Sequence, residues 1–318
     1  MEALRPKVAV VGAGNVGSTF AFSLMTSGAA REIVLIDRDV KRAEGECMDL
    51  NHGASFVQPV KIYSAGYEGC KEADVVVITA GAKQKPGETR IDLVRRNAGI
   101  FRDIIPEISK YAKDAVLLVA TNPVDILTYV TLKISGFPHN RVIGSGTVLD
   151  SSRCRYLISE HCRVDPRNVH AYIIGEHGDT ELPVWSNASI GGMKIEKYCP
   201  TCDRYGHCDR EKELGNIFKE VKNAAYKIIE AKGATYYAIG LALVRIAVSI
   251  LRDERSVLPV STLIDDYYGI NDICLSIPSV VGRNGAGQFL RLELSPLEQE
   301  QFKRSAQTLK DITGNIIL

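Results

Sequence analysis

Short runs of Val, Ile and Leu alternate with longer amphipathic segments through the first 145 residues. The apolar runs occupy 7–12, 32–37, 60–64, 74–79, 115–121 and 141–145, and helix-like segments lie near 15–28, 39–52, 89–112 and 123–134. The runs lack the alternation of apolar and polar residues that one solvated face produces, which indicates burial on both faces. The pattern predicts an α/β fold with a doubly wound parallel (Rossmann) sheet, whose ligand crevice lies at the carboxyl ends of the strands.

The pattern changes after about residue 146. VHAYIIGEHGD (169–179) is strand-like and runs into a polar loop, and 209–232 and 235–252 are expected to form two long helices. SVLPVSTLI, ICLSIPSVVG and FLRLEL then predict antiparallel strands, and a last helix is expected over 295–314. We therefore expect two domains, a Rossmann domain over 1–146 and an α+β domain over 147–318.

The composition excludes some classes of partner. The 318 residues are 45% hydrophobic and 24% charged, and the formal net charge is +1. Because no excess of one sign would attract nucleic acid or an anionic bilayer, we expect neither as a partner. No apolar run reaches the roughly 18–20 residues of a spanning helix. The first residues lead directly into a strand, without the pattern of an export signal, so we expect a cytoplasmic protein.

The eight cysteines form two groups. Five lie in strand-like or helix-like segments, where we expect buried free thiols: Cys47, Cys70, Cys154, Cys162 and Cys274. Cys199, Cys202 and Cys208 form C-x2-C-x4-H-C together with His207. Three thiols and an imidazole are a possible tetrahedral zinc set. However, the adjacent His207 and Cys208 are awkward simultaneous ligands, so we favour a loop entering a helix and expect no metal.

A glycine motif follows the first strand. Gly12, Gly14 and Gly17 form GxGxxG at the start of a helix, where they permit a tight turn, close approach of a pyrophosphate and close helix–strand packing. Asp37 ends the second strand, where a carboxylate accepts hydrogen bonds from ribose hydroxyls and repels a 2′-phosphate. The alternative is a glycine turn beside a surface Asp. The whole context predicts NAD binding in preference to NADP.

The middle of the chain carries candidate catalytic residues. His177 lies in a glycine-bounded loop, and a single His is more often structural than catalytic. Asp150 and Arg153, spaced i, i+3, share a helix face. Asp150 could fix the tautomer of an imidazole, and Arg153 could bind a carboxylate through two donors. The alternative is a simple ion pair within the helix.

With these residues, the chain resembles the NAD-dependent lactate/malate dehydrogenase family. Within that family it is most similar to the bacterial members that act on L-lactate. The resemblance extends over essentially the whole length, through GAGNVGS, AGAKQKPGETRIDL, VATNPVDILTYV, GSGTVLDSSR, IIGEHGDTELPVW and KGATYYAIG. It implies reversible hydride transfer between NADH and pyruvate, giving L-lactate at the end of fermentative glycolysis. It also implies an NAD-binding domain followed by a substrate domain.

The resemblance assigns a role to each candidate residue. His177 would be the general acid/base, Asp150 would hold its other ring nitrogen, and Arg153 would bind the substrate carboxylate. Arg90 would polarise the carbonyl where negative charge develops, and Asn122 would donate a hydrogen bond to the same oxygen.

Further residues follow from the same resemblance. Thr235 would line the substrate pocket, and Ile239 would be an apolar floor for the nicotinamide. The complete set of expected NAD contacts is Gly12, Gly14, Val16, Gly17, Asp37, Arg42, Tyr67, Gly81, Ala82, Ala120, Thr121, Asn122, Ser145 and Ile239.

The segment AGAKQKPGETR (80–90) places a neutral amide, Gln84, among three cations. The resemblance implies a loop that closes over bound substrate and excludes water. Members that act on malate carry Arg at the position of Gln84, because a dicarboxylate needs a second cation. Gln84 therefore predicts pyruvate as the substrate, since an Arg beside its methyl group would be buried without a partner.

Two other residues suggest regulation. In the bacterial relatives that this chain resembles, an Arg and a His at the positions of Arg155 and His170 bind fructose 1,6-bisphosphate between subunits. The resemblance therefore implies this effector and a homotetramer. The alternative is an exposed Arg and a His at a strand end.

Three other functions remain as alternatives. A malate dehydrogenase would differ at Gln84, and an NAD-dependent glycosidase would need a metal held by Cys and His near the nicotinamide. An NAD-binding module without catalysis would need none of His177, Asp150, Arg153 and Arg90.

Overall fold

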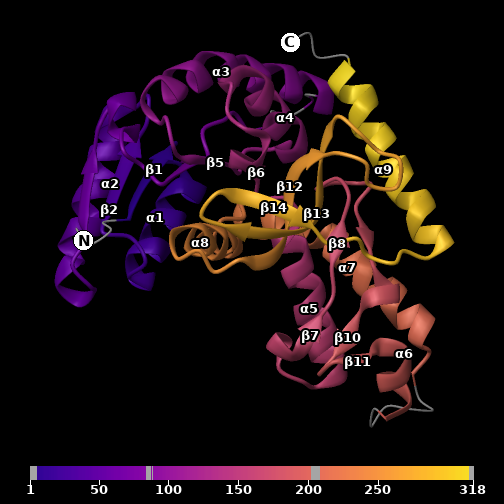
Figure 1. Ribbon diagram of the computed structural model, residues 1–318. Helices are drawn as coiled ribbons and strands as arrows, with labels where there is room; N and C mark the ends of the chain where they lie inside the picture. Colours follow the sequence, from indigo (N-terminus) through magenta and orange to yellow (C-terminus); the bar gives the residue numbers. More distant parts are fainter. Residues whose placement is uncertain (1–5, 84–86, 88, 202–207, 315–318) are drawn as a thin grey trace.

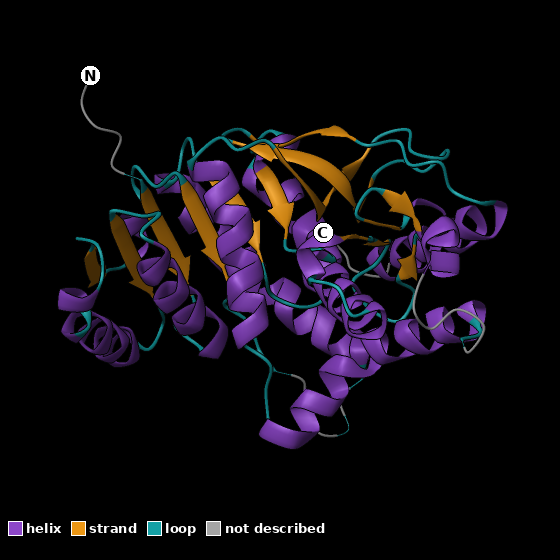
Figure 2. Ribbon diagram, turned by 90° about the horizontal axis from the view of Figure 1, so that it is seen from below, coloured by secondary structure: helices purple, strands orange, loops and turns teal. Residues whose placement is uncertain are grey.

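The computed structural model describes residues 6–83, 87, 89–201 and 208–314, apart from the side chain of Arg90. A nine-stranded sheet forms its centre (Figures 1 and 2). Six parallel strands lie in the order β3 (Lys61–Ser64), β2 (Glu32–Ile36), β1 (Lys7–Val11), β4 (Val75–Ile78), β5 (Val116–Val119) and β6 (Val142–Gly144). This order of strands is that of a dinucleotide-binding doubly wound sheet, with its crevice where the order reverses between β1 and β4. The predicted fold class is confirmed.

Three antiparallel strands extend the sheet beyond β6. They are β12 (Ser256–Ile264), β13 (Ile273–Gly282) and β14 (Gly285–Phe289), and β12 joins β6 through the pair Ser261–Gly144. Strands from both halves of the chain therefore form one continuous sheet.

Helices cover both faces of the sheet, which explains why its strands do not alternate. Val8 and Val10 of β1 pack in a core with α1 (Asn15–Ser27), α2 (Val40–His52) and α8 (Tyr237–Leu251). Ala9 and Val11 point the other way, into a core with α3 (Arg90–Tyr111), α4 (Val124–Ser135) and α9 (Pro296–Gly314). Successive side chains of a strand face opposite sides, so each residue must be apolar where both sides are covered.

Local signals in the sequence fix several helix ends. Thr89 and Asp92 form a capping box that starts α3, and each bonds to the other residue's backbone N–H. The Asp209 carboxylate accepts from the backbone N–H of Lys212 at the start of α7 (Arg210–Lys232), and Gly233, with φ +80°, ends this helix.

A smaller core lies in the second half. It joins α5 (Val148–Cys162), α6 (Ile195–Tyr198) and α7 to a three-stranded sheet of β11 (Met193–Lys194), β10 (Ser189–Ile190) and β7 (Val169–His170). These elements form the lower right of Figure 1. The expected strand over 169–179 is instead two short strands, because β7 joins this sheet and β8 (Ile173–Ile174) pairs with β9 (Leu182–Pro183).

The expected strand FLRLEL is a further correction. β14 ends at Phe289, and the backbone of residues 290–294 bonds to two tyrosine hydroxyls. Tyr267 Oη donates to Leu290 O and accepts from Leu292 N, and Tyr268 Oη accepts from Leu294 N, at 3.0–3.1 Å. The two tyrosine hydroxyls pair with backbone groups that a neighbouring strand would otherwise pair with. The segment therefore has the alternating apolar pattern of a strand but does not join the sheet.

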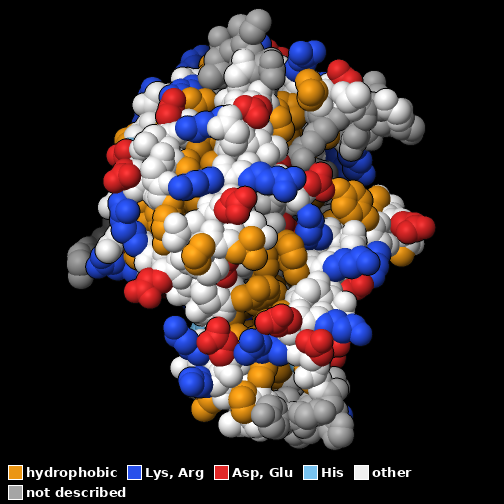
Figure 3. Space-filling model, turned by 90° about the vertical axis from the view of Figure 1, so that its right-hand side faces the viewer, with side chains coloured by type: hydrophobic (Ala, Val, Ile, Leu, Met, Phe, Trp, Pro, Cys, Tyr) orange, Lys and Arg blue, Asp and Glu red, His pale blue; other side chains and the backbone are white. Residues whose placement is uncertain are grey.

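The distribution of surface charge and the burial of the cysteines agree with the expectations from the composition. Cationic and anionic side chains are interspersed over the described residues on the face shown in Figure 3, around a central band of hydrophobic side chains. In the part of the chain that the structure describes, the helices are all too short or too polar to span a bilayer. The five cysteines that we expected to be buried thiols are buried, and they form no disulfide within the described residues.

Candidate active site

A cleft of about 600 Å³ opens where the strand order reverses. Gly12 (φ +110°) makes the turn from β1 into α1, and a Cβ on Gly17 would lie only 1.9 Å from Gly12 O. By contrast, no atom lies within 4 Å of a Cβ built on Gly14, so the backbone at Gly14 is open to a ligand. Close packing and open backbone at these positions are what a bound pyrophosphate requires.

Asp37 is held at the edge of this cleft. Its Oδ2 accepts from Ala13 N at 2.7 Å and its Oδ1 accepts from Asp39 N at 2.9 Å. Each carboxylate oxygen has a second lone pair, so both can still accept a ribose hydroxyl. The carboxylate is therefore oriented by the backbone before any ligand binds.

Half of the expected NAD residues line this cleft: Gly12, Gly14, Asp37, Arg42, Tyr67, Gly81 and Ala82. Asn122 lines a second pocket instead, and the others line neither cavity: Val16, Gly17, Ala120, Thr121, Ser145 and Ile239. Ile100 and Ile104 of α3 also line the cleft. The sequence did not single them out, because they repeat the apolar pattern that also buries the core face of α3.

The second pocket, of about 490 Å³, brings together Asn122, Asp150, Arg153 and His177. Thr235 is half-buried and lies outside its lining. Gln84 and the side chain of Arg90 lie outside the described residues.

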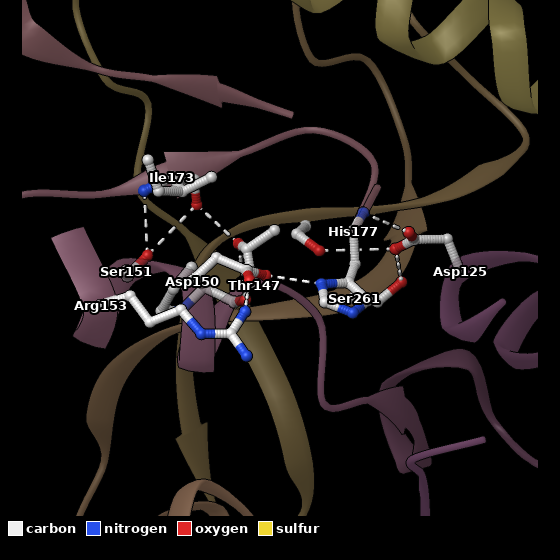
Figure 4. A network of polar contacts seen from close by, with 10 residues as sticks. Asp125, Thr147, Asp150, Ser151, Arg153, Ile173, His177 and Ser261 are labelled. Atoms are coloured by element: carbon white, nitrogen blue, oxygen red, sulfur yellow. Dashed lines mark hydrogen bonds and ion pairs between the residues drawn. The ribbon is translucent and has the colours of Figure 1, made fainter. Parts of the chain in front are cut away.

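Asp150 lies between a ring and a guanidinium (Figure 4). Its Oδ2 is 2.6 Å from His177 Nδ1, and its Oδ1 accepts from Arg153 Nη1 at 2.8 Å. Asp150 is 2% exposed, yet these two cations keep its pKa below the ordinary value although burial opposes them. Burial alone would lower the pKa of His177, because it disfavours the charged ring. The charge and the hydrogen bond of the Asp150 carboxylate together outweigh burial and raise this pKa to about 9. A protonated His177 can thus donate from Nε2 at neutral pH.

Hydrogen bonds between the start of α5 and β8 fix the positions of Asp150 and His177 relative to each other (Figure 4). Thr147 Oγ1 donates to Ile173 O at 2.6 Å, and Ser151 Oγ accepts from Ile173 N at 2.9 Å. Thr147 and Ser151 flank Asp150, and Ile173 precedes His177 by four residues, so these buried bonds hold both members of the pair.

Asp125, in the first turn of α4, fixes the backbone of the same histidine. Its Oδ2 accepts from His177 N at 2.7 Å, and its Oδ1 accepts from Ser261 Oγ at 2.6 Å (Figure 4). Asp125 is 2% exposed, and burial raises its pKa to about 6 although these donors oppose the shift. The sequence placed Asp125 only in a helical segment, because its partners, which include Ser276 Oγ at 3.4 Å from Oδ1, are 52 to 151 residues away.

Asn97 of α3 connects the two cavities. Its Oδ1 accepts from Ala82 N at 2.8 Å, and its Nδ2 donates to Asn122 O at 2.9 Å. Asn97 is 1% exposed. Its role was not predicted, although a polar residue on the buried face of an amphipathic helix is a usable signal.

The expected effector residues lie on neighbouring segments, and Arg155 of α5 is half-buried. Arg155 Nε donates to the backbone oxygen of Ala171, the residue after His170, at 3.0 Å. The guanidinium of Arg155 lies 5.3 Å from the centre of the Tyr172 ring. His170 is exposed on β7.

Only part of the cysteine cluster can be described. Cys208 Sγ lies 3.4 Å from His161 Nε2, which belongs to the last turn of α5. Cys202 and His207 lie outside the described residues. Among the residues that are described, three potential metal ligands lie with their ligand atoms within 4.8 Å of one another in the second pocket: Asp150, His177 and Glu181.

A dinucleotide cleft linked to a pocket with an imidazole–carboxylate pair and an arginine defines an NAD-dependent oxidoreductase. Residues 6–144 match the family model "lactate/malate dehydrogenase, NAD binding domain", and 147–316 match "lactate/malate dehydrogenase, alpha/beta C-terminal domain". The chain belongs to the lactate/malate dehydrogenase family, and its cofactor is NAD.

Curated relatives and solved structures agree with this membership. The chain is 57% identical to the L-lactate dehydrogenase of Acetivibrio thermocellus over 306 residues, which are 96% of each chain. It is 54% identical to the L-lactate dehydrogenase of Thermoanaerobacterium saccharolyticum, over 96% of this chain and 97% of that one. The crystal structure of the minor L-lactate dehydrogenase of Enterococcus mundtii superposes with a TM-score of 0.94 at 43% identity, covering 98% of this chain and 99% of that one. The family resemblance inferred from the sequence is confirmed.

Proposed function

We propose that this protein catalyses reversible hydride transfer between NADH and pyruvate, giving L-lactate at the end of fermentative glycolysis. The observation that carries the proposal is the position of Asp150, 2.6 Å from His177 Nδ1 and 2.8 Å from Arg153 Nη1 in one pocket. The names of the relatives, at up to 57% identity, support the same substrate.

The residues of the pocket have separate tasks. Arg153 keeps donors that Asp150 does not use, and these bind the substrate carboxylate. His177 gives a proton from Nε2 to the carbonyl oxygen during reduction and takes it back during oxidation. Bound NADH supplies the hydride. Asn122 and Arg90, by the family resemblance, stabilise the negative charge that develops on the same oxygen.

The choice of substrate depends on Gln84, as the sequence resemblance implies. Steady-state oxidation of NADH, followed at 340 nm, compares pyruvate with oxaloacetate. We expect kcat/KM for pyruvate to be higher by about 100-fold or more, because a neutral residue leaves a second carboxylate without a cation. Equal or greater kcat/KM with oxaloacetate would reject pyruvate as the substrate.

We also propose that the protein is a homotetramer activated by fructose 1,6-bisphosphate, bound by Arg155 and His170 of adjacent subunits. Support comes from the exposure of His170 and from the bond of Arg155 Nε to O of Ala171, the residue after His170. The saturation curve for pyruvate with and without the sugar bisphosphate tests the effector. A marked decrease in apparent KM is expected, and its absence in an Arg155→Gln variant identifies the site.

We propose the division into domains at residues 146 and 147. The last parallel strand ends at Gly144 and α5 begins at Val148, so the division lies in the short connection between them.

A further inference from the structure

Glu181 is a buried carboxyl in the substrate pocket that the mechanism above does not use. It precedes β9, is 7% exposed, and lines the pocket together with His177. Its backbone N–H donates to Gly178 O at 3.2 Å, but the described part of the chain offers no hydrogen bond to its side chain. A buried polar group that faces a binding pocket without a partner indicates that a ligand or a proton completes it.

The charges around Glu181 come from three segments. Asp150 and Arg153 face it from α5, and an oxygen of Glu181 lies within 4.8 Å of both an Asp150 oxygen and a His177 ring nitrogen. Lys222 of α7 lines the same pocket, and its ammonium group donates to Asp179 O at 2.7 Å.

The protonation of Glu181 decides how the pocket attracts an anion. Asp150, protonated His177 and Arg153 together carry one net positive charge. Lys222 and Asp179, which line the same pocket, add formal charges of opposite sign, so an ionised Glu181 would cancel this net charge. Burial and the neighbouring Asp150 raise the pKa of Glu181 to about 8, although His177, Arg153 and Lys222 oppose the shift. At neutral pH the carboxyl is therefore neutral and has an O–H to donate.

We propose that Glu181 is a substrate-binding residue that must carry its proton for the oxo acid anion to bind, and that it limits kcat/KM at alkaline pH. The inference rests on the proposed function, because it concerns the carboxylate that Arg153 binds. A negative substrate next to Glu181 favours the protonated carboxyl further, so binding above neutral pH takes up a proton at this residue as well as at His177.

Glu181→Gln tests the proposal, because Gln is neutral, nearly isosteric and still able to donate a hydrogen bond. Glu181→Asp keeps the ionisation, and Glu230→Gln, an exposed position of α7 outside the pocket lining, is the matched control. Thermal melting of each variant separates loss of fold from loss of function. The values of kcat and KM for pyruvate are measured from pH 6 to pH 10 with saturating NADH.

For the parent and the Glu230→Gln control we expect log(kcat/KM) to fall with a limiting alkaline slope that approaches two protons. For Glu181→Gln we expect a slope of one, which belongs to His177. The KM for pyruvate at pH 7 should stay within about threefold of the parent, and at pH 9 it should be about tenfold lower than in the parent. Glu181→Asp should keep the steep slope.

Proton uptake gives a second measurement. Oxamate, the amide analogue of pyruvate, is added to the NADH complex at pH 8 in weak buffer with a pH indicator. Glu181→Gln should take up fewer protons than the parent. Coincident pH profiles and equal uptake in parent and Glu181→Gln overturn the inference while leaving the proposed function intact. A parent that does not reduce pyruvate overturns the proposed function instead.

Discussion

Asp125 allows a quantitative test of the way the two halves hold His177. Its carboxylate, 2% exposed, accepts from His177 N at 2.7 Å and from Ser261 Oγ at 2.6 Å. Two substitutions separate its charge from its hydrogen bonds. Asp125→Asn removes the ionisable group. The amide oxygen can still accept from His177 N, and the amide nitrogen can donate to Ser261 Oγ. Asp125→Ala removes both bonds.

The sign of the charge effect follows from the raised pKa. Burial raises the pKa of Asp125 from 3.8 to about 6, so the folded state favours the protonated carboxyl. The resulting stability is fully present below the unfolded pKa and is lost as pH rises through about 6. With these two values, linkage gives about 1.4 kcal/mol lost between pH 5 and pH 8.

Asp125→Asn has no such ionisation. Its free energy of unfolding, relative to the parent, should therefore increase by about 1.4 kcal/mol from pH 5 to pH 8. Asp125→Ala leaves the His177 amide and the Ser261 hydroxyl unpaired, which costs about 1–3 kcal/mol for each group at both pH values.

Urea unfolding followed by circular dichroism at pH 5 and pH 8 measures these differences at equal protein concentration. The kinetics at pH 7 provide a second readout. Asp125→Asn should keep most of kcat, and Asp125→Ala should lose kcat more than it raises the KM for NADH. A difference between Asn variant and parent that does not change with pH, or an Ala variant as stable as the Asn variant, refutes the reasoning.

Four other substitutions test the proposed site. Asp150→Asn should move the His177 ionisation in the pH profile of kcat for pyruvate reduction from about 9 to 6.5 or below and lower kcat about 30-fold at pH 8; an unmoved ionisation contradicts the pairing with His177. Arg153→Lys should raise the KM for pyruvate by about 10- to 100-fold with little change for NADH, and a similar increase for both would contradict carboxylate binding. Asp37→Ser should raise the kcat/KM ratio of NADPH to NADH by about tenfold, whereas an unchanged ratio would remove Asp37 from ribose recognition. Gln84→Arg should shift preference from pyruvate to oxaloacetate by orders of magnitude, and equal kcat/KM ratios in variant and parent would count against it.

Much of the fold could be predicted from the sequence, because the relevant signals are local. The runs of β1, β2, β4 and β5 are apolar at successive positions, and this follows from burial on two faces. The extension of the sheet past β6 was not predicted, since the β6–β12 contact is a single pair between distant segments. The FLRLEL segment misled us because the hydroxyls of Tyr267 and Tyr268 replace a neighbouring strand.

The same distinction applies to the site. The glycines of GxGxxG, Asp37, and the i, i+3 pair Asp150–Arg153 have regular spacings, so the sequence indicated them directly. The roles of Asn97 and Asp125 depend on partners 15 to 151 residues away. Their signal is a polar side chain in an apolar helical segment, and it identifies burial without identifying the partner.

Asp150, Asp125 and Glu181 are buried carboxyls close to His177, and their partners explain their different pKa values. Asp150 has two cationic partners, and its pKa is lowered. Asp125 has only neutral donors, which offset burial in part, so its pKa rises to about 6. Glu181 has no hydrogen bond to its side chain among the described residues. Burial and the Asp150 charge outweigh the nearby cations His177, Arg153 and Lys222, so its pKa rises to about 8. Because the same kind of side chain is buried at all three positions, the difference lies in the partners. At neutral pH the pocket therefore holds one structural anion that charges His177, one anion that anchors its backbone, and one neutral carboxyl that leaves the attraction for the substrate intact.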